Sequence, residues 1–355
     1  MERKKERILY PDILRVLATF AVVLHHIAGK NMWAFKPTDV QYAVFLFEST
    51  IVKFAVPMFI LLSGMFLLNP DKHIMPKDLF RKQMLRVMTS FVFWTVFYAA
   101  FNTFAAWDYA PETVPERMFN AIFVTRQYHL WFLPLIFGLY LVTPFLRHMV
   151  AGCSKKELTA FMLMAFIFAS VLPLCETLKL LPALTALMRE LGITMVTGCV
   201  GWYVAGIYLV KYLNIQKRGT RLLCYILGVV SILLAYYLTM AHALETGENI
   251  ETWIIANAVT MVLPVIAVFV LVRAIADRLT FSEKSIKWIT ILAQDAFGIY
   301  LLHDACITVF ESIGLSTLKF NPYIAPPVLA VLCFLLTWLV VHLLRKIPFA
   351  RKFIL

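Results

Sequence analysis

The chain has 355 residues, of which 61% are hydrophobic and 15% charged, and its mean hydropathy of +0.79 excludes a soluble protein of average composition. The formal net charge of +12 would suit nucleic acid if the basic residues clustered on a soluble face, but they separate apolar segments, so no nucleic-acid partner is expected. Six cysteines stand far apart without ligand-like spacing, which predicts neither a disulfide framework nor a zinc site.

Ten apolar segments have the length of a membrane-spanning helix, about 20 residues each. Most lysines and arginines fall at the termini and in alternate connections, and the positive-inside rule places those parts in the cytoplasm. The sequence therefore predicts an all-α polytopic membrane protein with cytoplasmic N- and C-termini, and one membrane-embedded domain over residues 1–355 without a separate soluble domain. The predicted spans lie near residues 10–28, 42–68, 84–106, 127–150, 157–176, 191–213, 221–243, 252–276, 288–311 and 324–346.

The first predicted span carries charged and polar residues. Residues eleven positions apart on a helix differ in direction by only about 20°, so Arg15 and His26 share a face, whereas His25 points about 80° away. A charged side chain near the bilayer centre costs on the order of 3 kcal/mol even on a lenient scale, and such side chains usually face a bundle interior or a wet cavity. The residues on this shared face, called the polar stripe below, are Asp12, Arg15, Thr19 and His26.

Two interpretations of the polar stripe stay open on residue types alone. In the functional one, His26 acts as a general base, because a neutral imidazole is available at physiological pH, and Arg15 holds a phosphate or carboxylate. In the structural one, Asp12 and Arg15 form an ion pair at the inner interface while His25 and His26 lie at the outer one.

The second predicted span contains Lys53 about three helical turns from its start. A lysine at that depth needs a carboxylate, a carbonyl or water, and Glu48, five residues earlier, is only an approximate same-face partner. Ser63 and Gly64 follow in the same span; they favour a close helix contact over a nucleophile, since small residues mediate helix packing in membranes.

The connection before the third span is basic, with Arg81, Lys82 and Arg86 in the segment 77–86. Such a cluster commonly does no more than orient the helices by the positive-inside rule. The alternative is a cytoplasmic phosphate site, in which lysines act as point charges and arginines as forks. A phosphorylated nucleotide such as coenzyme A would suit it.

Further polar residues lie in the outer halves of later spans. His129 and Trp131 open the fourth span, where an aromatic belt is expected, and Tyr300, His303 and Asp304 share one face of the ninth at three- and four-residue spacing. With His26, these histidines suggest a polar acceptor pocket. No metal is expected, because no two of the histidines share a helix at ligand spacing.

Taken together in chain order, these motifs resemble the membrane acyltransferase-3 family, and in particular its short members that O-acetylate surface polysaccharides. Each motif alone is weak, but their order and predicted topology cover nearly the whole chain. The residues that carry the resemblance are Arg15 and His26 with ten residues between them, Val56 to Gly64, the basic run to Arg86, His129 to Phe132 with Leu133, and Phe297 to His303.

The resemblance implies a ten-helix O-acyltransferase of the bacterial inner membrane. Its implied donor is cytoplasmic acyl-CoA, with no tightly bound cofactor, and its implied acceptor is a hydroxyl of an envelope glycan or lipid-linked saccharide. His26 would then serve as general base or transient acyl carrier, and Arg15 would orient the donor or stabilise developing charge. The residues implied to hold the CoA phosphates are Arg86, Lys82 and Arg81.

The chain departs from the family pattern at three positions. Gln83 stands where relatives usually carry a basic residue, Lys53 replaces a common arginine, and Asp304 follows His303 where proline is frequent. No C-terminal extracytoplasmic esterase-like domain follows the last span. We therefore expect this chain to complete transfer in its membrane domain or to pass the acyl group to a separate protein.

Two other function classes compete with the enzyme. Ten helices with intramembrane charges also suit a transporter or flippase for a glycan or anionic solute, although no inverted repeat is visible. A non-catalytic partner in an envelope complex is the third class, which the polar stripe disfavours. The acyl group, the acceptor, the leaflet of transfer and the oligomeric state are left open by the sequence.

Overall fold

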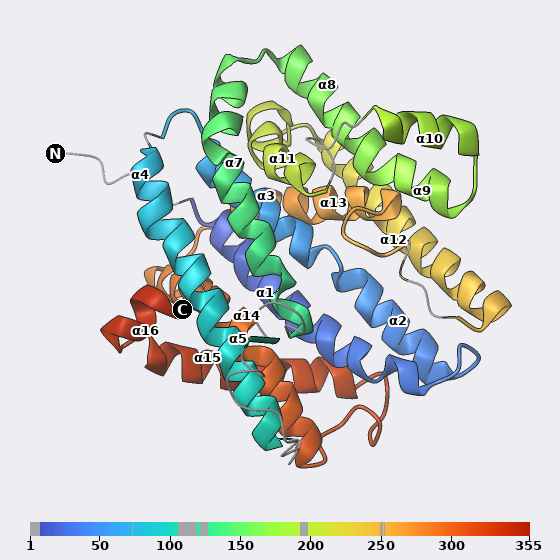
Figure 1. The fold of residues 1–355 in the computed structure, drawn as a ribbon, viewed down its shortest axis with the longest axis vertical. Helices are drawn as coiled ribbons and strands as arrows, with labels where there is room; N and C mark the ends of the chain where they lie inside the picture. Colours follow the sequence, from blue (N-terminus) through green and yellow to red (C-terminus); the bar gives the residue numbers. More distant parts are fainter. Residues whose placement is uncertain are drawn as a thin grey trace. The chain divides into compact units, whose positions relative to one another are not determined.

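The computed structural model describes residues 8–72, 74–105, 119–120, 127–191, 198–248, 251 and 253–355. Within these ranges every regular element is a helix and no strand occurs (Figure 1). Helical backbone satisfies its own hydrogen bonds, as a lipid environment requires. The all-α prediction is confirmed.

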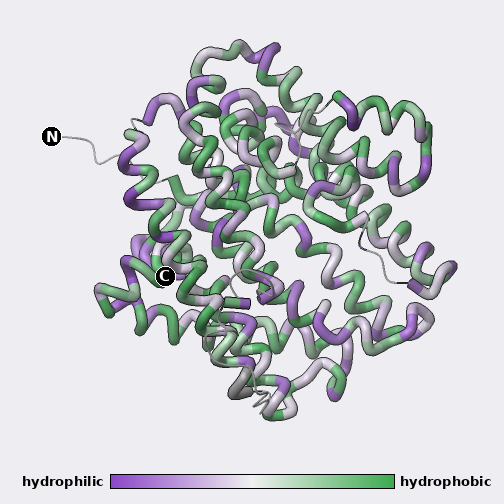
Figure 2. Tube along the Cα trace, in the orientation of Figure 1, coloured by the Kyte–Doolittle hydropathy of each residue, from purple (hydrophilic) through white to green (hydrophobic). Residues whose placement is uncertain are grey.

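Eight helical segments of the described chain are long and apolar enough to cross a membrane, and hydrophobic residues predominate along them (Figure 2). Of the two further predicted spans, one matches α14 (Glu283–Ser312) and the other contains α11 (Val200–Tyr212), with residues 192–197 outside the described part. The count of ten and the orientation of the termini stay predictions. The eight segments are Tyr10–Ala34, Val40–Leu67, Pro76–Asn102, Tyr128–Gly152, Lys155–Thr177, Arg218–Thr246, Val259–Ala276 and Ala325–Leu344.

Two predicted spans depart from a continuous helix. The second is broken at Lys53 and Phe54 into α2 (Val40–Val52) and α3 (Ala55–Leu67), because Pro57 has no N–H to donate to the Lys53 carbonyl. The span predicted over 252–276 is helical only from Val259, in α13 (Val259–Ala276). Residues 253–258 form turns, and residue 252 lies outside the described part. The hydropathy of this segment reflects burial of Ile254 in the core rather than helix.

The chain forms two compact units, which we call unit 1 and unit 2. Unit 1 comprises residues 1–66 and 153–294, and unit 2 comprises residues 67–152 and 295–355. Besides α2, α3, α11 and α13, unit 1 contains α1 (Tyr10–Lys30), α8 (Lys155–Phe166), the π-helix η4 (Ile167–Val171), α9 (Leu172–Thr177), α10 (Pro182–Glu190) and α12 (Arg218–Thr246). Unit 2 contains α4 (Pro76–Asp78), the π-helix η2 (Leu79–Met84), α5 (Leu85–Ala105), α7 (Phe132–Gly152), the later part of α14, α15 (Ala325–Leu344) and α16 (Pro348–Phe353).

Small residues let helices of unit 1 approach closely. A Cβ added to Gly64 of α3 would lie 1.7 Å from the Tyr203 carbonyl oxygen of α11, and one added to Gly206 would lie 2.0 Å from the Leu61 carbonyl oxygen. Backbones at this separation gain packing that larger residues would prevent. The interpretation of Gly64 as a helix contact is confirmed.

In unit 2 the C-terminal residues Ile354 and Leu355 pack against α5 and α14. The indole nitrogen of Trp94 in α5 donates to the Ile354 carbonyl oxygen at 2.9 Å. A Cβ on Gly298 of α14 would lie 2.5 Å from Val341 of α15 and 3.0 Å from Leu355. The close approach of α14 and α15 at Gly298 determines which polar side chains of these two helices meet.

Candidate functional site

The polar stripe of α1 contains an ion pair. The Arg15 guanidinium lies 3.2 Å from the Asp12 carboxylate, and Asp12, in the first turn, also complements the positive end of the helix dipole. The Thr19 hydroxyl donates to the Arg15 carbonyl oxygen at 2.8 Å. The pair required by the structural interpretation is therefore present, yet the Arg15 side chain keeps 33% of its surface exposed.

The two histidines of α1 have different surroundings. His25 Nδ1 lies 2.8 Å from the Ser49 hydroxyl of α2, so this ring is fixed by a helix neighbour. His26 lies beside it, with ring centroids 5.3 Å apart. Both are half-buried, whereas Leu24 and Ile27 on either side are buried.

Lys53 lies at the break between α2 and α3 and pairs with Glu251. Its ammonium is 3.1 and 3.2 Å from the two Glu251 oxygens, and only 12% of the lysine side chain is exposed, against 41% of the glutamate. The carboxylate that the sequence required is thus supplied from 198 residues away and not by Glu48. Ser63 donates to the Phe59 carbonyl oxygen on its own helix at 2.9 Å.

In unit 2 the basic connection forms the π-helix η2. The Leu85 N–H bonds to the Phe80 carbonyl five residues back, which is the π-helical pattern. Arg81 is exposed, whereas Arg86 is half-buried. Lys82 pairs with Asp78 at 3.2 Å.

Gln83, where a basic residue was expected, is turned back onto its own helix. With the amide oriented so that its nitrogen donates, that nitrogen lies 3.0 and 3.2 Å from the carbonyl oxygens of Asp78 and Leu79. Arg81, Lys82 and Arg86 therefore stay the predicted phosphate ligands of this segment. The guanidinium carbon of Arg86 lies 5.5 Å from the centroid of the Phe297 ring on α14.

Asp295 of α14 is a buried carboxylate in unit 2 that was not among the sequence-predicted site residues. Its carboxylate accepts hydrogen bonds from two side chains of α15 and from the residue that follows α15. None of the Asp295 side-chain surface is exposed. The partners are Arg345 at 2.6 Å, His342 at 3.1 Å and Trp338 at 3.2 Å. We call these four residues the Asp295 cluster. A carboxylate within an apolar span is the signal that could have located it.

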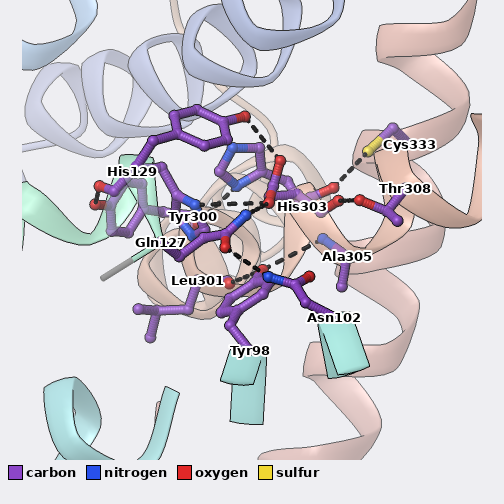
Figure 3. Close-up of polar contacts among 12 residues, drawn as sticks. Tyr98, Asn102, Gln127, His129, Tyr300, Leu301, His303, Ala305, Thr308 and Cys333 are labelled. Carbon is purple, nitrogen blue, oxygen red and sulfur yellow. Dashed lines mark hydrogen bonds and ion pairs between the residues drawn. The ribbon is translucent and has the colours of Figure 1, made fainter. Parts of the chain in front are cut away.

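A second buried carboxylate organises the other sequence-predicted residues of unit 2 (Figure 3). Asp304 accepts hydrogen bonds from Gln127 at 2.6 Å and from the Tyr128 hydroxyl at 2.7 Å. His129 Nδ1 lies 3.9 Å from the same carboxylate. His129 and Asp304 are each 1% exposed, so the low surrounding dielectric strengthens these electrostatic interactions.

His303 and Tyr300 complete this network on α14. The Tyr300 hydroxyl donates to the His129 carbonyl oxygen, and the rings of His129 and His303 lie 5.1 Å apart in a T-shaped arrangement. The Tyr98 hydroxyl donates to the Leu301 carbonyl oxygen at 2.7 Å. We call the following residues the Asp304 network: Tyr98, Gln127, Tyr128, His129, Tyr300, His303 and Asp304.

The predicted site residues are thus distributed over the two units. Unit 1 holds Lys53, Ser63 and the polar stripe. Unit 2 holds Arg81, Lys82, Arg86 and the Asp304 network, together with Trp131, which is 41% exposed, as an aromatic-belt residue would be. His129 and His303 come together as expected, and His26 belongs to unit 1. Among the described residues no group of three or more His, Cys, Asp or Glu gathers as a metal site.

One comparison with known proteins bears on these sites. A family model described as an acyltransferase domain, that of the acyltransferase-3 family, matches residues 8–345, which include the polar stripe, η2, the Asp295 cluster and the Asp304 network. Neither a curated protein nor a solved structure matches the chain. The family match covers most of the sequence, and we conclude that the chain belongs to the acyltransferase-3 family and is a membrane acyltransferase.

Proposed function

We propose that this acyltransferase moves an acyl group, in the first instance acetyl, from cytoplasmic acyl-CoA to a hydroxyl of an envelope glycan or lipid-linked saccharide in the bacterial inner membrane. The observation that carries the proposal lies in α1. Arg15 and His26 share one face of a membrane-length helix, and both side chains are half-buried. Polar groups kept at such a position are costly and are characteristic of a functional site.

The roles of the two residues follow from their chemistry. His26 takes the proton of the acceptor hydroxyl, and the hydroxyl oxygen forms a bond to the thioester carbonyl carbon. When the carbon–sulfur bond breaks, the CoA sulfur leaves and receives that proton. In the alternative route His26 itself first accepts the acyl group and then passes it to the hydroxyl. In both routes Arg15 offers a fixed positive charge to the carbonyl oxygen that becomes negative.

Asp12 supports this assignment without touching a substrate. Its carboxylate, 3.2 Å from Arg15, limits the directions in which the guanidinium can point. The Arg15 side chain keeps 33% of its surface exposed beside this carboxylate, and we take that exposed part to meet the donor.

The remaining residues are assigned by unit. Arg81, Lys82 and Arg86 hold donor phosphates. The buried His129 and His303, with Tyr300 and Trp131, belong to the acceptor side. Lys53 and Ser63 support α2 and α3 through the contacts described above.

The test uses the full-length protein in lipid nanodiscs with radiolabelled acetyl-CoA and an envelope glycan fraction. His26→Ala should abolish transfer, and Arg15→Gln should reduce it by at least a hundredfold. The matched control is His148→Ala, which removes an exposed histidine bonded to the Pro144 carbonyl oxygen and should leave transfer unchanged. Full transfer by His26→Ala would refute the mechanism. Mass spectrometry of glycans from cells with and without the protein identifies the acceptor by a lost ester mass.

A further inference from the structure

We propose that Arg86 and Arg345 form a two-arginine site for a phosphate group in unit 2, and that Asp295 is the residue that positions Arg345 in it. The proposal rests on the proposed function, because it takes the phosphate to be one of those on the acyl-CoA donor. Arg345, Asp295 and His342 lie more than 200 positions after the basic connection in the sequence and were not among its predicted phosphate ligands.

Both arginines contact one short stretch of α14. Arg345 bonds to Asp295 at 2.6 Å, and Arg86 lies over Phe297, two residues later, at 5.5 Å. The small Gly298 next in the chain allows α15 to approach, since an added Cβ would lie 2.5 Å from Val341. This close approach of α15 is what brings Arg345 within reach of Asp295.

The charges of this site are unbalanced. Arg345 is paired with Asp295, but the Nε atom of Arg86 is buried without a hydrogen-bond partner, and the positive charges of Arg86 and Arg345 act on each other unfavourably. Buried polar atoms are normally hydrogen-bonded, and two guanidiniums with a single carboxylate leave an excess of positive charge. An anion between them would satisfy both conditions.

Phosphate is the anion whose chemistry fits. Guanidinium groups present forked N–H donors that match phosphate oxygens two at a time. Asp295, with no exposed side-chain surface, fixes Arg345 by one nitrogen, and His342 and Trp338 hold the carboxylate from the same side of α15. Because Asp295 holds one nitrogen of Arg345, it limits the directions in which the other N–H groups of this guanidinium point.

The site is accessible to a ligand from outside the unit. The side chain of Arg345 is 24% exposed and that of His342 is 38% exposed. Arg81, five residues before Arg86, is also exposed. The sequence predicts that this end of the helices faces the cytoplasm, where acyl-CoA is found. An anionic lipid headgroup carries the same phosphate chemistry, so the experiment must separate the two sources.

The experiment compares Arg345→Gln with wild type in nanodiscs of neutral lipid. We expect the KM for acetyl-CoA to rise at least tenfold with kcat within twofold, and the Kd for CoA, measured by calorimetry without turnover, to rise equally. Arg345→Lys keeps the charge but loses the forked N–H donors, so its KM and Kd should lie between those of wild type and Arg345→Gln. Asp295→Asn should raise the same KM, because Arg345 then loses its fixed direction. Arg351→Gln, an exposed arginine on α16, is the matched control.

Acetyl-pantetheine, which has no nucleotide phosphates, provides the decisive arm. Wild type and Arg345→Gln should use it with equal kcat/KM, whereas an equal loss with both donors would mean a structural role and overturn the proposal. Acetyl-dephospho-CoA then shows which phosphate is bound. An effect of Arg345→Gln that appears only in anionic-lipid nanodiscs would overturn the donor assignment in favour of lipid. If the wild-type protein neither binds CoA nor transfers acetyl, the proposed function is refuted. If Arg345→Gln leaves the KM for acetyl-CoA and the Kd for CoA unchanged, only this phosphate site is refuted.

Discussion

Replacing Asp304 by asparagine tests the Asp304 network directly. The carboxylate of Asp304 accepts from Gln127 at 2.6 Å and from Tyr128 at 2.7 Å, using a different oxygen for each. Asparagine keeps the shape but turns one acceptor into a donor, so one of these two donors then faces another donor. Losing a hydrogen bond to a charged group costs about 1.5–3 kcal/mol.

We therefore expect Asp304→Asn to lower the free energy of unfolding by roughly 1.5–3 kcal/mol. Equilibrium unfolding in mixed detergent micelles measures it, with acetyl transfer followed in parallel. The control is Thr308→Val, which removes a hydroxyl that bonds to the Asp304 backbone carbonyl at 3.0 Å and should cost about 1 kcal/mol or less. Asp304→Asn with wild-type stability would show that the carboxylate contacts contribute nothing, and the reasoning would be wrong.

Three further predictions follow from the packing and ion pairs. Gly64→Ala should prevent α3 and α11 from packing and yield little folded protein by size-exclusion chromatography, because its Cβ would lie 1.7 Å from a backbone oxygen; normal yield would contradict this. Glu251→Gln should destabilise the protein more than Lys53→Met in the same unfolding assay, since the lysine is the deeper partner, at 12% exposed against 41%, and an unpaired buried charge costs about 3–5 kcal/mol. Arg81→Gln should raise the KM for acetyl-CoA more than Lys82→Gln, because Lys82 is already paired with Asp78; equal effects would show that this ion pair does not keep Lys82 from the donor.

Much of the fold could be predicted from the sequence because membrane insertion depends on local composition. The hydropathy of twenty consecutive residues decides whether a segment can cross the bilayer, so the apolar helices were located without their partners. The same reasoning marked Lys53 and Arg15 as residues that need compensation, since the cost of a charge in lipid does not depend on which group pairs with it. The Asp12 pair of Arg15 was also within reach, because it lies three residues away on one helix.

The tertiary structure decided which residues far apart in the sequence form ion pairs. It also decided where the backbone departs from a regular α-helix. Glu251 reaches Lys53, and Arg345 reaches Asp295, only because distant helices pack together; no periodicity within one segment encodes such a contact. The π-helix Leu79–Met84, with the Leu85 N–H bonded to the Phe80 carbonyl five residues back, is not predicted by a 3.6-residue period. The sequence by itself determined where polar groups are costly. The packing of the helices decided which of those groups meet, because that depends on shape complementarity over the whole unit.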